Sequence, residues 1–305
     1  MLVLSLCIFE IIEDTIYINK SFMKLNIFYS VILFTTIFNL KAQINNGRPK
    51  FDIQKDILLA QFDCKTDVDD LHTVAAFNSL IKNDEYKKLN FIAVAGTYGI
   101  QEGLYVPPNS LFQKAFGNQW VDAHSNRKSA LNKVFKAAKE TLNNKGNIWI
   151  AEGGQSDFSA LLIMKLMKEK FPFPINKKIH IVQHSDWNEE VTSPELLEYV
   201  KKNSVYFKIP DGNVIDNGSP CFRTPNFTLW KNIKNKDNIG VWSHAIELGN
   251  KYNGVDNRYN NEAIANNGLD FSDLSEICWI LGIKEIRDTK AFFNQYVFNI
   301  DKVKQ

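Results

Sequence analysis

Residues 57–70 read ILLAQFDCKTDVDD, an apolar run followed by four aspartates within eight residues. The run from Ile57 to Phe62 is typical of a strand that is buried on both faces of a parallel sheet. Carboxylates crowded at the end of such a strand repel one another, and a divalent cation would offset that repulsion. Because oxygen ligands suit hard cations, we expect a hard ion such as Ca²⁺ or Mg²⁺ here. The alternative is a solvated acidic turn.

Similar short apolar runs recur along the chain and alternate with segments of helical periodicity. The expected strands are residues 57–62, 90–95, 148–151, 179–182 and 205–209, and the expected helices include 69–83, 129–142, 157–170 and 272–281. This alternation predicts an α/β fold in which a mostly parallel sheet is flanked by helices on both faces. We expect one domain over residues 43–305.

The composition is that of an ordinary globular protein. The 305 residues are 45% hydrophobic and 23% charged, with a formal net charge of +2. Such a balance does not suggest a polyanionic partner, and no block of Lys and Arg suggests nucleic-acid binding.

The first 42 residues are expected to be a signal peptide rather than part of the fold. Met23 and Lys24 precede a mostly apolar stretch that ends at Leu40, and Ala42 offers a small residue for cleavage. Met23 is an alternative start. The apolar run is too short for a stable membrane span, although an uncleaved anchor is the competing interpretation. We therefore expect a periplasmic or secreted protein.

Polar clusters follow three of the expected strands. They are residues 63–70, residues 153–157 (Gly-Gly-Gln-Ser-Asp) and residues 184–188 (His-Ser-Asp-Trp-Asn). The carboxyl ends of parallel strands share one edge of a sheet, where ligands of α/β proteins bind. We therefore expect the three clusters to converge on one site.

The order and spacing of these clusters resemble the inosine–uridine nucleoside hydrolase superfamily. That family has an Asp-x-Asp-x-x-x-Asp-Asp motif between its first strand and first helix, and Asp63, Asp69 and Asp70 match it. Residues 94–96 (Val-Ala-Gly), 153–157, 186–188 (Asp-Trp-Asn) and 272–273 (Ser-Asp) resemble its later motifs. The resemblance covers residues 57–282 and implies a nucleoside-hydrolase-like fold.

The resemblance implies a Ca²⁺ site built from Asp70, Asp273 and the carbonyl of Ser156, with Asp67 as a further ligand. The implied reaction is hydrolysis of an N-glycosidic bond in a nucleoside or a related sugar conjugate. In that reaction the metal lowers the pKa of a bound water, and a carboxylate takes its proton. Asp67 and Asp63 are the candidate catalytic carboxylates.

For the sugar, the resemblance implies contacts from Asp69, Asp186 and Asn188, with the ion as the alternative partner of Asp69. Position along the chain adds His72, one turn into the first helix, and His184, directly after a strand. For each histidine a structural hydrogen bond is the alternative. The expected partner is thus a small sugar or nucleoside, and a homo-oligomer is compatible with the sequence.

Two positions depart from the family pattern. Lys65 stands where the family has its second aspartate, and Ser272 stands where it has a histidine. A divergent branch of secreted bacterial proteins also lacks that aspartate and carries an acid at the position of Asp67, and this chain resembles that branch. Lys65 and Ser272 favour an alternative function, a non-catalytic calcium-dependent carbohydrate-binding protein.

Overall fold

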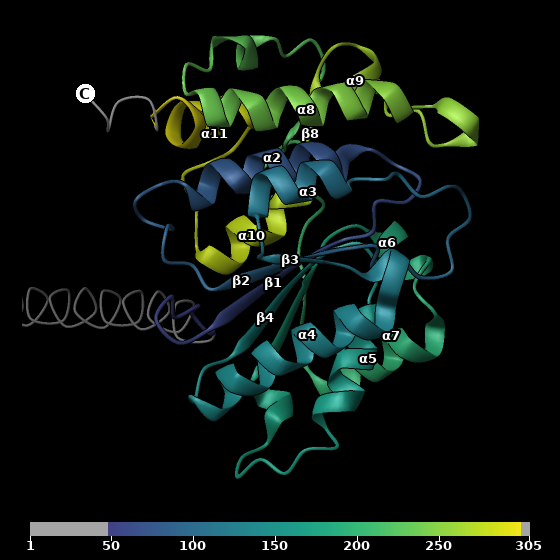
Figure 1. Ribbon diagram of the computed structural model, residues 1–305, viewed down its shortest axis with the longest axis vertical. Coiled ribbons are helices and arrows are strands. Elements are labelled where there is room, and N and C mark those ends of the chain that lie inside the picture. Colours follow the sequence, from purple (N-terminus) through teal and green to yellow (C-terminus); the bar gives the residue numbers. More distant parts are fainter. Residues whose placement is uncertain (1–47, 300–305) are drawn as a thin grey trace, which may run out of the picture. The chain divides into compact units, whose positions relative to one another are not determined.

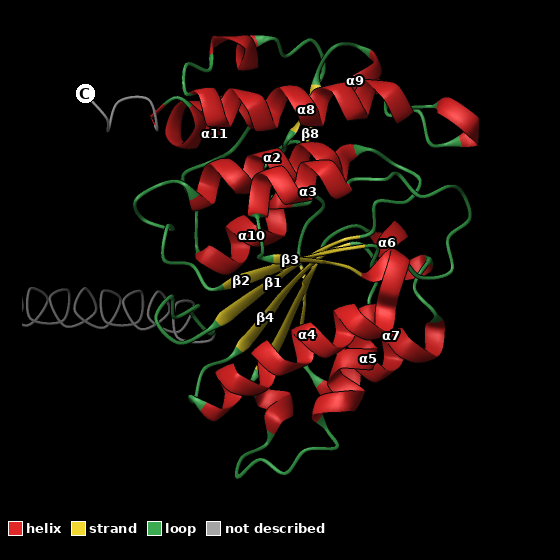
Figure 2. Ribbon diagram, in the orientation of Figure 1, coloured by secondary structure: helices red, strands yellow, loops and turns green. Residues whose placement is uncertain are grey.

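The predicted alternation of strands and helices forms a six-stranded, fully parallel sheet with helices on both faces (Figure 2). The computed structural model describes residues 48–299, so the expected signal peptide lies outside the described residues. The described fold forms one compact unit that begins at Lys50. The strands are β1 (Ile57–Phe62), β2 (Phe91–Ala95), β3 (Trp120–Asp122), β4 (Ile148–Gly153), β5 (Ile179–Gln183) and β6 (Val205–Lys208).

Strand β1 lies at the centre of the sheet, and this buried position accounts for its apolar sequence. It pairs with β2 on one side and β4 on the other, so that Leu59 lies between Ile92 and Ile150. Its side chains alternate between two cores: Leu58 packs into one and Leu59 into the other. Every position of β1 is buried because both faces are covered, as the continuous apolar run indicated.

Two layers of helices cover the sheet (Figure 1). On one face lie α2 (Asp69–Ile81), α3 (Asn109–Phe116) and α10 (Leu274–Leu281), and α8 (Lys236–Tyr252) packs against α2. On the other face lie α4 (Ala123–Asn143), α5 (Asp157–Leu166) and α7 (Pro194–Asn203). Helix α7 begins with proline at its first turn, where the missing N–H costs nothing.

Shorter elements connect these layers. A two-stranded antiparallel ribbon pairs β7 with β8. The short elements are η1 (Ile175–Lys177), α6 (Asp186–Glu190), β7 (Arg223–Thr224), η2 (Leu229–Asn232), η3 (Val255–Asn257), α9 (Glu262–Ala265), β8 (Leu269–Asp270), α11 (Thr289–Phe292) and the π-helical turn η4 (Phe293–Val297).

Several local differences separate the structure from the expectation, and one is that helix α5 ends at Leu166 rather than near 170. Strand β3 and helix α6 were not expected, because three and five residues are too short to show a clear period. Helix α4 begins at Ala123 rather than near 129, since its first turn is separated from the rest by a kink at Asn126.

The sheet order places a ligand crevice at β1 and β4. The strands run β3-β2-β1-β4-β5-β6, so the chain winds outward in both directions from the β1–β4 pair. Sheets of this order bind ligands outside the carboxyl ends of the strands at that reversal. Asp63 follows β1 directly and Gly153 ends β4, which puts both at this point.

None of the helices within residues 48–299 is both long and apolar enough to cross a membrane.

Candidate functional site

A cavity of about 550 Å³ opens at the carboxyl ends of β1, β4 and β5. Seven of the predicted site residues line it: Asp63, Asp67, Asp69, Asp70, His184, Asn188 and Asp273. The predicted convergence of far-apart polar clusters is therefore present in the structure. The cavity wall also includes residues that the sequence did not single out, namely Thr66, Gln101, Glu102, Ser185, Val191, Asn213, Arg223 and Tyr259.

Asp63 is held firmly at the end of β1. Its Oδ1 accepts a hydrogen bond from the backbone N–H of Lys65 (2.8 Å). Its Oδ2 accepts one from Gln155 Nε2 (2.9 Å) and one from Gln101 Nε2 (3.2 Å). Burial raises the pKa of Asp63 to about 7, and the nearby charge of Asp273 adds to the rise. A carboxyl with such a pKa can exchange a proton near neutral pH.

Asp70 sits in the first turn of α2 with one oxygen bonded and the other bare. The backbone N–H of Cys64, a residue in the left-handed region (φ 51°), donates to Asp70 Oδ2 at 2.6 Å. Asp70 Oδ1 is buried and has no hydrogen-bond partner among the described residues. Burial, followed by the charges of Asp273 and Asp63, raises the pKa of Asp70 well above its usual value.

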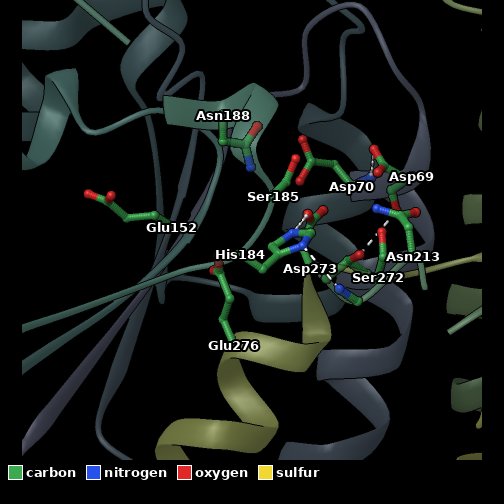
Figure 3. A network of polar contacts seen from close by, with 12 residues as sticks. Asp69, Asp70, Glu152, His184, Ser185, Asn188, Asn213, Ser272, Asp273 and Glu276 are labelled. Carbon is green, nitrogen blue, oxygen red and sulfur yellow. Dashed lines mark hydrogen bonds and ion pairs between the residues drawn. The ribbon is translucent and has the colours of Figure 1, made fainter. Parts of the chain in front are cut away.

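Asp69 and Asp67 complete the acidic wall beside Asp70. The backbone N–H of Asp70 donates to Asp69 Oδ1 (2.9 Å, Figure 3). Burial and the charge of Asp67 raise the pKa of Asp69 well above its usual value. Asp67 Oδ1 accepts bonds from Val68 N (2.6 Å) and Asn261 Nδ2 (3.3 Å). Burial, followed by the charge of a neighbouring aspartate on β8, raises the pKa of Asp67 to about 7.

Asp273 reaches the same cavity from the other end of the described chain, at the start of α10. The side chains of Asp70 and Asp273 lie within hydrogen-bonding reach of each other. Asp273 Oδ1 accepts a 2.8 Å bond from His184 Nε2. Two acids that the sequence places far apart are thus close enough to share one cation.

His184 contacts two carboxylates, and Figure 3 shows its ring beside one of them, Asp273. Its Nδ1 is 3.3 Å from Asp211 Oδ1, and its Nε2 bonds Asp273. Burial lowers the pKa of His184, but the bonds to the two aspartates outweigh this and raise it to about 10. His184 therefore carries a positive charge that offsets part of the acidic cluster. Its backbone N–H donates to the buried Glu276 (2.9 Å).

Lys65 points away from the carboxylates. Its Nζ donates to the carbonyl of Gln101 at 2.6 Å and lies 4.7 Å from the centre of the Tyr98 ring. No ion pair joins Lys65 to an acid within residues 48–299. The cation that replaces the family's aspartate therefore stands at the edge of the cavity rather than among the acids.

Three predicted site residues lie outside the cavity wall. The side chain of Asp186 is 91% exposed and pairs with Lys208 (3.2 Å). His72 is buried, its Nδ1 accepts a 3.3 Å bond from a backbone N–H of β8, and burial lowers its pKa to about 3, so it is neutral. The carbonyl of Ser156 accepts a helical bond from the N–H of Ala160 (2.8 Å).

The donor set fits a hard cation in its chemistry. Five aspartates and Glu102 line one cavity. Asp70 Oδ1 is a buried oxygen with no hydrogen-bond partner among the described residues, which costs free energy unless a ligand satisfies it. In the described part of the chain, no three His, Cys, Asp or Glu side chains already have the arrangement of a metal site. Binding an ion would therefore require a third carboxylate to move toward the Asp70–Asp273 pair.

Comparisons with models of protein families, with curated proteins and with solved structures find no match. The resemblance to nucleoside hydrolases therefore depends on the residues and on their arrangement in this chain.

Proposed function

We propose that the protein is a Ca²⁺-dependent hydrolase of N-glycosidic bonds, exported to the periplasm or the exterior, and that it acts on a nucleoside or a related sugar conjugate. The observation that supports this most is the convergence of Asp63, Asp67, Asp69, Asp70 and Asp273 on one cavity at the reversal point of the sheet. Burial and mutual repulsion raise the pKa values of these carboxylates, which lowers the stability of the fold. Carboxylates with such raised pKa values cluster at functional sites.

Asp70 and Asp273 are the residues that would hold the ion, with Asp67 as the nearest substitute for the missing aspartate. When bound, Ca²⁺ supplies an electropositive centre that makes a nearby water more acidic. Ser156 is not retained as a ligand, because its residue does not line the cavity.

Asp63 is the residue best placed to accept a proton. Two glutamine side chains and a backbone N–H fix its carboxylate toward the cavity, and its pKa near 7 suits proton transfer at neutral pH. In the proposed reaction a water oxygen bonds the anomeric carbon and loses a proton to Asp63. The C–N bond breaks, and its electron pair stays on the departing nitrogen, which is protonated from solvent. Asp67 is the second candidate for the base.

Asp69 and Asn188 are placed to bind the sugar hydroxyls. Both line the cavity, and Figure 3 shows Asn188 to the left of Asp70 and Asp69. Trp187, 46% exposed, presents a ring that can pack on an apolar sugar or base face. His184 bonds Asp273 directly, so it keeps that carboxylate oriented.

The second candidate function is calcium-dependent carbohydrate binding without catalysis. Two observations favour it. Lys65 replaces an acid, and Ser272, at the family's histidine position, is buried and does not line the cavity. No acid for the leaving group is therefore available from that position.

A nucleoside panel separates the two functions. Sugar released from each nucleoside would be measured with calcium and with a chelator. Release that requires calcium, falls at least 100-fold in Asp63→Ala and persists in the exposed Asp186→Ala control supports hydrolysis. Calcium-dependent sugar binding without release supports the second candidate, and neither binding nor release refutes both.

A further inference from the structure

A second cavity, of about 430 Å³, adjoins the acidic one, and Lys65 lines both. Its character is opposite to that of the first. The eight described residues that line it include Lys65 and Arg258 and no Asp or Glu. The two cavities thus place an acidic surface and a basic surface on either side of one lysine.

Aromatic rings form the wall of this second cavity. The rings of Tyr105 and His124 stack 3.8 Å apart and nearly parallel. The hydroxyl of Tyr98 bonds His124 Nδ1 at 3.0 Å, and Lys65 Nζ lies over the Tyr98 ring. Arg127 lies 5.5 Å from the same ring, which adds a third cation close to the wall. The wall is therefore preorganised by stacking, and it carries positive charge.

Two polar groups on this wall lack partners. Arg258 Nε and the Tyr105 hydroxyl are buried without a hydrogen bond to any residue of the described chain. The Arg258 side chain is only 8% exposed, and its nearest carboxylate, Asp256, is 3.5 Å away and 73% exposed. An exposed partner of this kind neutralises a buried guanidinium poorly. An anionic ligand in this cavity would supply the negative charge that the exposed Asp256 supplies poorly to Arg258.

We propose that this second cavity binds an anionic substituent, a phosphate, sulfate or carboxylate, of the molecule whose sugar enters the acidic cavity. The inference depends on the proposed function only in placing a sugar in that first cavity. Lys65 and Arg258 attract the anion, and the aspartates of the first cavity repel it from the sugar site. Opposite charges on the two sides of Lys65 therefore fix the direction in which the ligand lies.

Calorimetry with matched pairs of sugars tests this. Ribose 5-phosphate is compared with ribose, and galacturonate with galactose, using the full chain with calcium. At least one charged sugar should bind about 10-fold more tightly than its neutral partner, the gain of one charge-assisted contact. Lys65→Gln and Tyr105→Phe should each remove most of that preference. Lys284→Gln, an exposed lysine beyond the far end of α10, should keep it.

The outcomes separate the anion site from the reaction. A preference for the phosphate or for the carboxylate identifies the anion. Equal affinity for charged and neutral sugars, or a preference that survives both variants, overturns the anion site while leaving hydrolysis open. A preference for the charged sugar, combined with no sugar release in the nucleoside panel, supports the anion site and removes the hydrolase proposal. No binding of any of these four sugars refutes the anion site. Because Tyr105→Phe removes only a hydroxyl, its result is usable even if Lys65→Gln alters the fold.

Discussion

Replacing Asp70 by asparagine should stabilise the metal-free protein and abolish calcium binding. The change keeps the shape of the side chain, and the remaining oxygen can still accept the bond from Cys64 N. The new amide takes the place of Oδ1, which has no hydrogen-bond partner among the described residues. A buried charge and its repulsion are removed, and no hydrogen bond is lost.

The size of the effect follows from the neighbouring acid. The pKa of Asp63 rises from 3.8 to about 7, and this shift of about three units costs about 4 kcal/mol of folding free energy at pH 7. Asp70 is buried more deeply in the same cluster, so we expect Asp70→Asn to gain about 2–4 kcal/mol at pH 7.5. Because the folded-state pKa is raised, the penalty shrinks as pH falls toward 3.8, and the gain should shrink with it.

Urea unfolding at pH 7.5 and pH 5, in metal-free buffer and with calcium, measures this. Calcium at 100 times its Kd should stabilise the wild type by about 2.7 kcal/mol and leave the variant unchanged. Asp186→Asn, at an exposed site, is the matched control and should change neither quantity. A variant that is less stable than the wild type at pH 7.5, yet still stabilised by calcium, would refute the reasoning.

Three further changes test other parts of the structure. His180 is buried, stacks on Trp149 (4.2 Å) and has its pKa lowered by burial to about 4. Because the folded protein holds His180 in its neutral form, the contribution of His180 to the free energy of unfolding is complete above pH 6.5 and falls by about 3 kcal/mol toward pH 4. In His180→Phe, the free energy of unfolding measured with urea should therefore depend less on acid pH. Trp187→Ala should weaken sugar binding by calorimetry about 5–10-fold without lowering the melting temperature, because the ring is half exposed. Asn188→Ala should weaken sugar binding by about 10-fold, whereas Asp186→Ala should leave it unchanged, and the reverse order would show that the sugar lies outside the cavity.

Most of the sheet was predictable because its central strands are continuous apolar runs. Strand β1 has the predicted bounds, and β5 extends one residue beyond its prediction. The acids after β1 could also be placed, since a parallel sheet brings strand ends to one edge. Lys65 shows the limit of that logic: it lies within the acidic motif, but its side chain turns to the carbonyl of Gln101.

Other parts of the site carried only a weak signal. Asp211 and Asn213 follow β6, the strand next to β5 at the same sheet edge, so the strand order would have indicated them. Asp186 could not be placed from its number, because the residue before it has a positive φ and helix α6 then directs the aspartate toward solvent. Side-chain direction in such a short helix depends on backbone turns that a sequence pattern does not encode.

The partnership of Asp70 with Asp273 has a consequence for how the molecule assembles. The first acid emerges early in synthesis and the second only when α10 has been made, so closing this contact is a long-range event with a large entropic cost. Before docking, water screens the aspartates and their repulsion is slight; the electrostatic barrier arises only in the final approach of α10. A bound ion would lower that last barrier. Cation binding would then accompany the docking of α10 late in folding rather than nucleate the fold early.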